Sequence, residues 1–203
     1  MRIQLAKPPP APRQLLRKEE RQESILRGAA AAFARSGFAA TSMDDVATAC
    51  GVTKLIVYRH FDSKEELYRA VLQRVFDRQA EELVAGLQRP GQRGLGMRTM
   101  LTVARENPDG FVLLWRHAAR EPQFAEYASE QRAAAVEAAR QLLGTVTGDP
   151  TFDRWDAEAV IAWLVETVLV WLEVGDPARD DELIDRATAG LRAMRAAWLA
   201  DSG

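Results

Sequence analysis

Apolar residues recur at helical spacing along almost the whole chain. Ile25, Ala29 and Phe33 follow one another at intervals of four, which places them on one face of a helix. Strand-type alternation of apolar and polar residues is absent over any useful length, and turn-forming residues separate the periodic segments. The pattern predicts an all-α fold of about nine helices.

Caps and breakers bound the helices of the N-terminal part. Gly37 is placed as the C-terminal cap of the first helix, and Ser42 as the N-cap of the second. Gly51 ends the second helix, and Ser63 with Glu66 forms a capping-box pattern at the start of the fourth. The predicted helices cover residues 17–37, 42–51, 53–60 and 63–88.

Turn signals divide the rest of the chain into five further helical segments, predicted over residues 94–106, 110–120, 122–143, 153–174 and 178–200. In the segment 153–174, apolar residues such as Val160, Leu164 and Trp171 occupy more than one side of the helix. A helix that is apolar nearly all round needs partners on both faces. One partner can be the domain core and the other a second subunit.

Composition narrows the classes of protein. The single cysteine excludes an intrachain disulfide and a multi-thiolate metal site, and the sequence predicts no metal and no cofactor. No apolar run is long enough to span a bilayer, and the N-terminus lacks the apolar core of a signal peptide, so we expect a cytoplasmic protein. Residues 1–70 carry 12 basic and 8 acidic side chains, and the remainder has a net charge of −6. A basic N-terminal third favours contact with a polyanion.

The first sixteen residues are rich in proline and contain Arg2, Lys7 and Arg13. Their composition predicts a disordered N-terminal arm over residues 1–16. The alternative is a basic arm that contacts the minor groove of DNA.

The most informative segment runs from Phe38 to Tyr68. Two short helices joined by a tight turn at Gly51 match helix-turn-helix geometry, in which the second helix presents its outer face to a major groove. Val46, Val57 and Phe61 are placed to pack inward and hold the two helices together.

This segment resembles the TetR family of transcriptional regulators. The resemblance rests on Thr41, Gly51-Val52-Thr53-Lys54, Tyr58-Arg59-His60-Phe61 and Ser63-Lys64-Glu65. It implies a helix-turn-helix DNA-binding domain over residues 17–62 and a ligand-binding and dimerisation domain over residues 63–203.

The candidate DNA-contacting residues, all but Leu55 supported by the resemblance, are Thr41, Ser42, Thr53, Lys54, Leu55, Tyr58, Arg59, His60 and Lys64. Leu55 and Ile56 depart from the family, which often has glycine and a small or polar residue there. Leu55 is placed to press on a thymine methyl group, which would shift the sequence preference. The alternative is that Tyr58 and His60 are half-buried helix residues and that the lysines are solvated charges.

All five tryptophans lie in the C-terminal two-thirds of the chain. The resemblance implies an effector pocket among the middle helices, and an aromatic lining with a few polar groups fits such a site. The candidate ligand-binding residues are Phe111, Trp115, Phe124, Tyr127, Trp163 and Glu166. The alternative is that these residues form ordinary core. His117 is interpreted as a surface or core histidine rather than a polar contact of the pocket.

Together these features predict a sequence-specific transcriptional regulator. We expect a homodimer, paired through residues of about 153–200, on double-stranded operator DNA with an inverted repeat. The expected function is repression, relieved by a small apolar or aromatic effector, although activation is an alternative within the class. A helical protein-binding adaptor is a second possibility. An enzyme is the third, based on His117 with Glu121 or Glu126, but no catalytic motif accompanies them.

Overall fold

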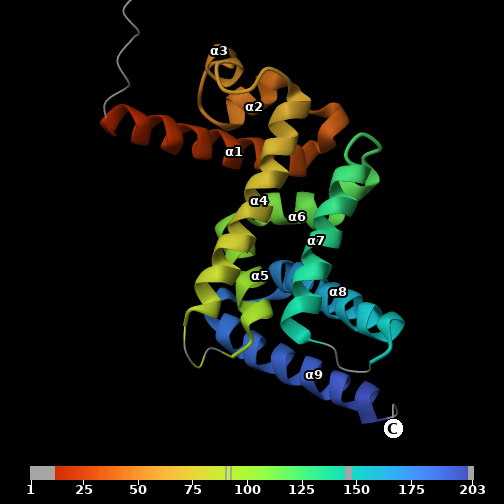
Figure 1. Ribbon diagram of the computed structural model, residues 1–203. Helices are drawn as coiled ribbons and strands as arrows, with labels where there is room; N and C mark the ends of the chain where they lie inside the picture. Colours follow the sequence, from red (N-terminus) through yellow and green to blue (C-terminus); the bar gives the residue numbers. More distant parts are fainter. Residues whose placement is uncertain (1–11, 90, 92, 145–147, 201–203) are drawn as a thin grey trace, which may run out of the picture. The chain divides into compact units, whose positions relative to one another are not determined.

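The computed structural model describes residues 12–89, 91, 93–144 and 148–200. Within these residues the chain forms nine α-helices and no strand, which confirms the predicted all-α class (Figure 1). Most of the arm expected over residues 1–16 lies outside the described residues, and the first helix begins at Pro12. The helices are α1 Pro12–Ala40, α2 Met43–Ala49, α3 Lys54–Tyr58, α4 Lys64–Leu87, α5 Leu95–Glu106, α6 Pro108–Val112, α7 Ala125–Leu143, α8 Pro150–Val174 and α9 Asp180–Ala200.

The chain divides into two compact units, Met1–Tyr68 and Arg69–Gly203. Helix α4 begins in the first unit and continues into the second. Its first turn belongs with the helix-turn-helix because Leu67 and Tyr68 are buried at 0% and 1% exposure. None of the helices in the described part of the chain is both long and apolar enough to cross a membrane.

An aromatic cluster fills the core of the first unit. The rings of Phe33, Phe38 and Tyr68 lie with their centroids 5.0 to 5.9 Å apart, in stacked and edge-on pairs. Between the two phenylalanines the helical path of α1 breaks at Gly37, whose φ is +78°. Only glycine adopts this conformation without strain, so Gly37 turns the chain and brings Phe38 back against Phe33.

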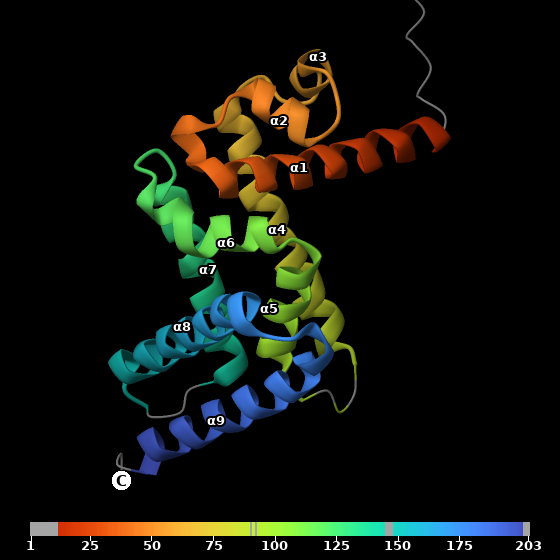
Figure 2. The ribbon, with the colours of Figure 1, turned by 180° about the vertical axis from the view of Figure 1, so that it is seen from behind.

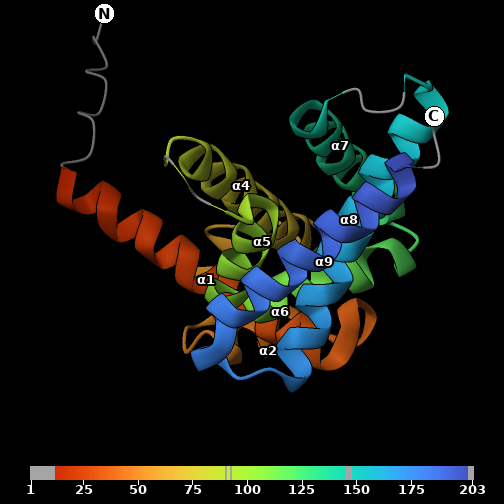
Figure 3. The same ribbon diagram turned by 90° about the horizontal axis from the view of Figure 1, so that it is seen from below.

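The second unit is built on α8. This helix packs against α7 and α5, and α9 packs against both α5 and α8. Figure 3 shows α8 and α9 running next to each other. Close approach of α5 to α8 depends on Gly96, because a Cβ atom there would lie 2.9 Å from a methyl carbon of Leu164.

The segment after α5 differs from the single helix expected over residues 110–120. The Asn107 side chain accepts a hydrogen bond from the Gly110 amide at 3.0 Å and starts α6 at Pro108. Helix α6 then widens into a π-helical turn, Leu113–His117, and tightens into the 3-10 turn Ala118–Arg120. The apolar spacing of this segment is compatible with all three geometries, so it predicted a helix but not its winding.

Candidate DNA-binding surface and effector cavity

The turn between α2 and α3 is held by tight packing on α1. Gly51 adopts a φ of +64°, which lets the chain reverse between the two helices. Gly28 faces this turn so closely that a Cβ atom there would lie 2.5 Å from the Cys50 sulfur. From the other side, Val57 is fully buried and Phe61 is 3% exposed. The turn is therefore fixed, and α3 has one buried face and one exposed face.

The exposed face of α3 carries most of the side chains that the sequence assigned to DNA. Leu55 is 62% exposed and Tyr58 is 43% exposed, and Thr53 and Arg59 are also exposed. The Lys54 ammonium forms an ion pair with Asp44 of α2 at 2.6 Å, which raises the pKa of Lys54. The face thus offers a cation, a hydroxyl, a phenol and a guanidinium around one apolar side chain, which suits both phosphate and base contacts.

Two of the assigned residues, Thr41 and Lys64, form hydrogen bonds to backbone carbonyls within the protein. The Thr41 side chain is 2% exposed, and its hydroxyl donates to the carbonyls of Gly37 and Ala32 at 2.7 and 3.3 Å. The Lys64 ammonium donates to the carbonyls of Phe38 and Ala39 at 2.9 and 3.4 Å and lies 4.3 Å from the centre of the Phe38 ring. Apart from Ala32, the carbonyls that they bond lie near the C-terminal end of α1, where a helix leaves its last carbonyls without partners.

Ser42 and His60 lie at the edges of the exposed face. Ser42 and Asp45 form a capping box at the start of α2, with the Asp45 amide donating to the Ser42 hydroxyl at 3.2 Å. That box leaves Ser42 exposed at the helix N-terminus. His60 is half-buried, and its pKa is lowered by burial and by the positive charges of Lys18 and Arg21. An imidazole with a lowered pKa is neutral near pH 7, where it offers a hydrogen bond rather than a full charge.

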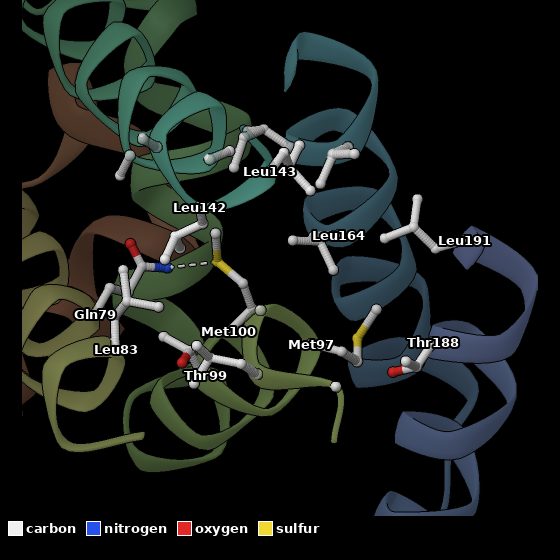
Figure 4. Close-up of a pocket in the computed structure, with 18 of the residues that line it drawn as sticks. Gln79, Leu83, Met97, Thr99, Met100, Leu142, Leu143, Leu164, Thr188 and Leu191 are labelled. Atoms are coloured by element: carbon white, nitrogen blue, oxygen red, sulfur yellow. Dashed lines mark hydrogen bonds between the residues drawn. The ribbon is translucent and has the colours of Figure 1, made fainter. Parts of the chain in front are cut away.

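A cavity of about 530 Å³ lies within the second unit. Figure 4 shows Gln79 and Leu83 on one side and Leu164, Thr188 and Leu191 on the other. The lining comes from α4, α5, α7, α8 and α9 and consists mainly of leucine, alanine and methionine. Its size falls within the range of small-molecule sites.

Few polar groups line the cavity, and most are buried without a good partner. The Gln79 amide donates to the sulfur of Met100 at 3.0 Å, and sulfur is a weak acceptor. The hydroxyl groups of Thr99 and Thr188 are buried and have no hydrogen-bond partner among the described residues. Such groups are costly to bury unless a bound molecule or water satisfies them.

The comparisons with known proteins agree with this arrangement. Residues 25–71 match the family described as bacterial regulatory proteins, tetR family. The chain is 30% identical over 193 residues to the HTH-type transcriptional activator FasR of Mycolicibacterium smegmatis, covering 90% of this chain and 84% of FasR. The chain belongs to the TetR family. It is a DNA-binding transcriptional regulator, and the relatives it matches are named as regulators rather than enzymes.

Solved structures of transcriptional regulators and DNA-bound proteins share the fold. A regulator from Streptomyces coelicolor is 27% identical with a TM-score of 0.60, covering 91% of this chain and 86% of that one. AibR, solved in complex with isovaleryl coenzyme A and operator DNA, is 20% identical with a TM-score of 0.63, covering 83% of this chain and 96% of that one.

None of the six residues that the sequence assigned to the effector lines the cavity of this TetR-family chain. Phe111 and Phe124 are buried core residues, at 0% and 1% exposure. The Tyr127 hydroxyl donates to Gln73 at 2.7 Å, and burial raises its pKa to about 12. The remaining three are Trp115, half-buried after α6, and Trp163 and Glu166, exposed on α8.

Sequence reasoning missed the residues that do line the cavity, because it followed the large aromatic side chains. Phe76 is the single aromatic residue among the described lining residues. The signal that was present is the run Ala133-Ala134-Ala135 with Ala138 and Ala139 in α7, four of which line the cavity. Small side chains on a helix that faces leucine and methionine leave space that larger ones would fill.

Proposed function

We propose that the protein acts as a homodimer, binds an inverted-repeat operator through α3, and changes its operator affinity when an aliphatic effector fills the cavity. The observation that carries the proposal is the course of α4. Its first turn is part of the core of the DNA-binding unit, and its later residues Phe76, Gln79 and Leu83 line the cavity. One continuous helix therefore belongs both to the DNA-binding unit and to the cavity wall.

The lining favours an aliphatic effector over an aromatic one. Leucine and methionine side chains adapt to a flexible chain, whereas few ring surfaces are present for stacking. The Gln79 amide and the Thr99 hydroxyl are placed to bond an oxygen of the effector.

An anionic group on the effector fits the α9 side of the cavity. Arg192 and Arg195 both belong to the wall, but Arg195 is held by Asp156 at 2.7 Å. Arg192 is exposed and has no ion pair among the described residues, so it is available for a carboxylate or phosphate. AibR, which shares the fold, was solved in complex with isovaleryl coenzyme A, an acyl thioester. This complex supports an acyl compound as the class of effector. The effector proposed is an aliphatic chain with an acidic head, either a fatty acid or its coenzyme A thioester.

The proposed dimer surface lies on α8, as the sequence led us to expect for residues 153–200. Its exposed apolar side chains are Phe152, Trp155, Trp163, Val170 and Val174, at 37% to 76% exposure. Their spacing places them along one stripe of the helix. Trp198 of α9 extends the stripe, because its ring lies 4.4 Å from that of Trp155. A continuous apolar stripe of this kind favours a second copy of the chain as its partner.

The effector acts by shifting a population. The bound effector stabilises the position of α4 in which the cavity can accept it. It can change DNA binding only if it binds more tightly to the protein with α4 in one position than in another. The resemblance predicts release from the operator and hence repression. Similarity to FasR, which is named an activator, favours activation as a second candidate. A reporter gene behind the selected operator distinguishes the two by the sign of its response when the protein is expressed.

The test begins with selection of bound sequences from a random duplex pool, where an enriched inverted repeat is expected. Decanoate, palmitate, their coenzyme A thioesters and naphthoate are then compared by thermal shift and by operator affinity. We expect an aliphatic compound to raise the melting temperature and to change operator affinity. A response to naphthoate alone would contradict the aliphatic assignment, and a thermal shift without a change in DNA affinity would refute the coupling.

Two variants of α7 locate the site. Ala138→Phe fills the cavity, and we expect it to abolish the effector response while leaving operator binding intact. Ala133→Phe introduces the same side chain at an exposed position of the same helix that does not line the cavity. A full effector response in Ala138→Phe would show that the effector binds elsewhere, and an equal loss in both variants would show that the loss does not come from filling the cavity.

A further inference from the structure

Helix α1 extends well beyond the core that it helps to form. Its first described buried residue is Ile25, and the preceding residues 18–22 and 24 are exposed. From Pro12 to Ile25 this extension spans about 20 Å at the rise of an α-helix. In Figures 1 and 2 the N-terminal half of α1 projects past α2 and α3. Packing does not explain why the chain maintains a helix here.

The exposed extension continues the face of α1 that holds the helix-turn-helix. Lys18, Arg21, Ile25 and Gly28 follow at intervals of three, four and three, which places them on one side of the helix. Gly28 contacts the turn at Cys50, and the Cys50 thiol lies 3.5 Å from the Ile25 carbonyl. The two basic residues therefore lie on the side of α1 that faces the turn before α3.

Charge is segregated around this part of the helix. Glu19, Glu20 and Glu23 fall on the opposite side from Lys18 and Arg21. Neither basic side chain forms an ion pair with any residue that the structure describes. A solvent-exposed helix with no charged binding partner is more stable when acidic and basic side chains alternate along each face, because they then form ion pairs three or four residues apart. Here the positive face is kept apart from the acids and directed toward the DNA-binding elements.

The basic face also reaches the far end of α3. The charges of Lys18 and Arg21 act on His60, which follows α3 by two residues, and contribute to lowering its pKa after the larger effect of burial. The basic face of α1 therefore lies close enough to the end of α3 for its charges to act on His60. Both helices lie entirely within the first unit.

We propose that Lys18 and Arg21 contact the phosphate backbone of DNA beside the groove that α3 enters, so that α1 forms a second, sequence-independent part of the binding surface. The proposal rests on the DNA-binding activity of the protein and not on its effector response. Exposed basic side chains that neutralise phosphates release counterions, which makes their contribution measurable as salt dependence.

The experiment measures binding of the full-length protein to a mixed-sequence duplex by fluorescence anisotropy over a range of salt. For Arg21→Ala and Lys18→Ala we expect the slope of log affinity against log salt to fall by about 0.9 for each phosphate that is no longer neutralised. At roughly 0.1 M salt, one phosphate fewer lowers the affinity by about eightfold. Arg21→Lys should restore most of the slope, since it keeps the charge.

Arg27→Ala is the matched control. Arg27 is an exposed arginine of the same helix on the opposite side from Lys18 and Arg21, so its removal changes the net charge equally. We expect it to leave the salt slope unchanged. Circular dichroism checks that each variant keeps its helix content. Equal slopes for Arg21→Ala and Arg27→Ala would refute the proposal.

A second readout tests the geometry without DNA. The chain has two histidines, so the ring signals of His60 can be followed by NMR. Arg21→Ala should raise the pKa of His60 and Arg27→Ala should not, and the reverse order would contradict the placement. Failure to select any operator would count against the proposed function, but the salt slopes on mixed-sequence DNA would still test this surface.

Discussion

The ion pair between α8 and α9 offers a test of how this fold is held together. Asp156 of α8 is 7% exposed, and its carboxylate accepts three hydrogen bonds from the Arg195 guanidinium at 2.7 to 3.0 Å. The side chains of the two partners are 10% and 20% exposed. The perturbation is Arg195→Met, which keeps an apolar stem of similar length and removes the guanidinium.

Loss of one partner leaves a carboxylate buried without compensation. Breaking a fully buried pair costs about 3–5 kcal/mol. Arg195 is one-fifth exposed, so water partly replaces it, and we expect Arg195→Met to lower the free energy of unfolding by about 2–3 kcal/mol. The neighbouring Arg192 is exposed and unpaired among the described residues, and its replacement by methionine should cost less than about 0.5 kcal/mol.

Urea unfolding followed by circular dichroism measures the effect. With a slope of about 2 kcal/mol per molar urea, the expected cost lowers the midpoint by about 1 M. All variants are compared at one protein concentration, because association shifts apparent stability. The double variant Asp156→Leu with Arg195→Met should recover much of the loss, since no charge is then left buried. If the two single losses simply add in the double variant, the pair does not act as a coupled unit and the reasoning fails.

Three further predictions follow from single contacts. Lys64→Met should lower stability by about 1–2 kcal/mol, because two carbonyls of α1 lose a charged donor. An unchanged urea midpoint would show that these two bonds do not stabilise the fold. The absorbance of one tyrosinate should appear only near pH 12 and be absent in Tyr127→Phe. Because burial favours the neutral phenol, stability should fall as pH rises from the ordinary value of 10.0 to about 12. The hydrogen bond from Arg105 lowers the pKa of Asp180. The stability that this bond contributes is present above the ordinary pKa of 3.8 and is lost as pH falls below it. Arg105→Met should therefore reduce the dependence of the urea midpoint on pH in the acid range.

The helix-turn-helix could be predicted in detail because its signals are local. Gly51 forms the expected turn and adopts a positive φ, and Val57 and Phe61 are buried as expected. Ser42 is the N-cap of α2 as expected, and it forms a capping box with Asp45. Each of these features depends on neighbours within a few residues, so one sequence suffices to find them.

The roles of Thr41 and Lys64 depend on contacts that the sequence does not reveal. Both residues occupy positions suited to a phosphate contact, but the Gly37 break brings the C-terminal carbonyls of α1 within their reach. A hydroxyl or ammonium group beside unpaired carbonyls bonds them in the free protein. These bonds depend on the path of the chain after Gly37, so the family motif alone does not reveal them.

The cavity of the second unit could not be predicted from the sequence for a different physical reason. A cavity is the space that side chains fail to fill, so it forms where residues are small, and the large rings that attract notice in a sequence are those that fill space. Phe111 and Phe124 are buried in the core, whereas Ala138 and Ala139 line the cavity. The better guide in a helical chain of this kind is therefore a helix with a run of alanines opposite one rich in leucine and methionine. Which helices lie opposite each other is a tertiary property, so it is known only from the structure, in which α7 packs on α8.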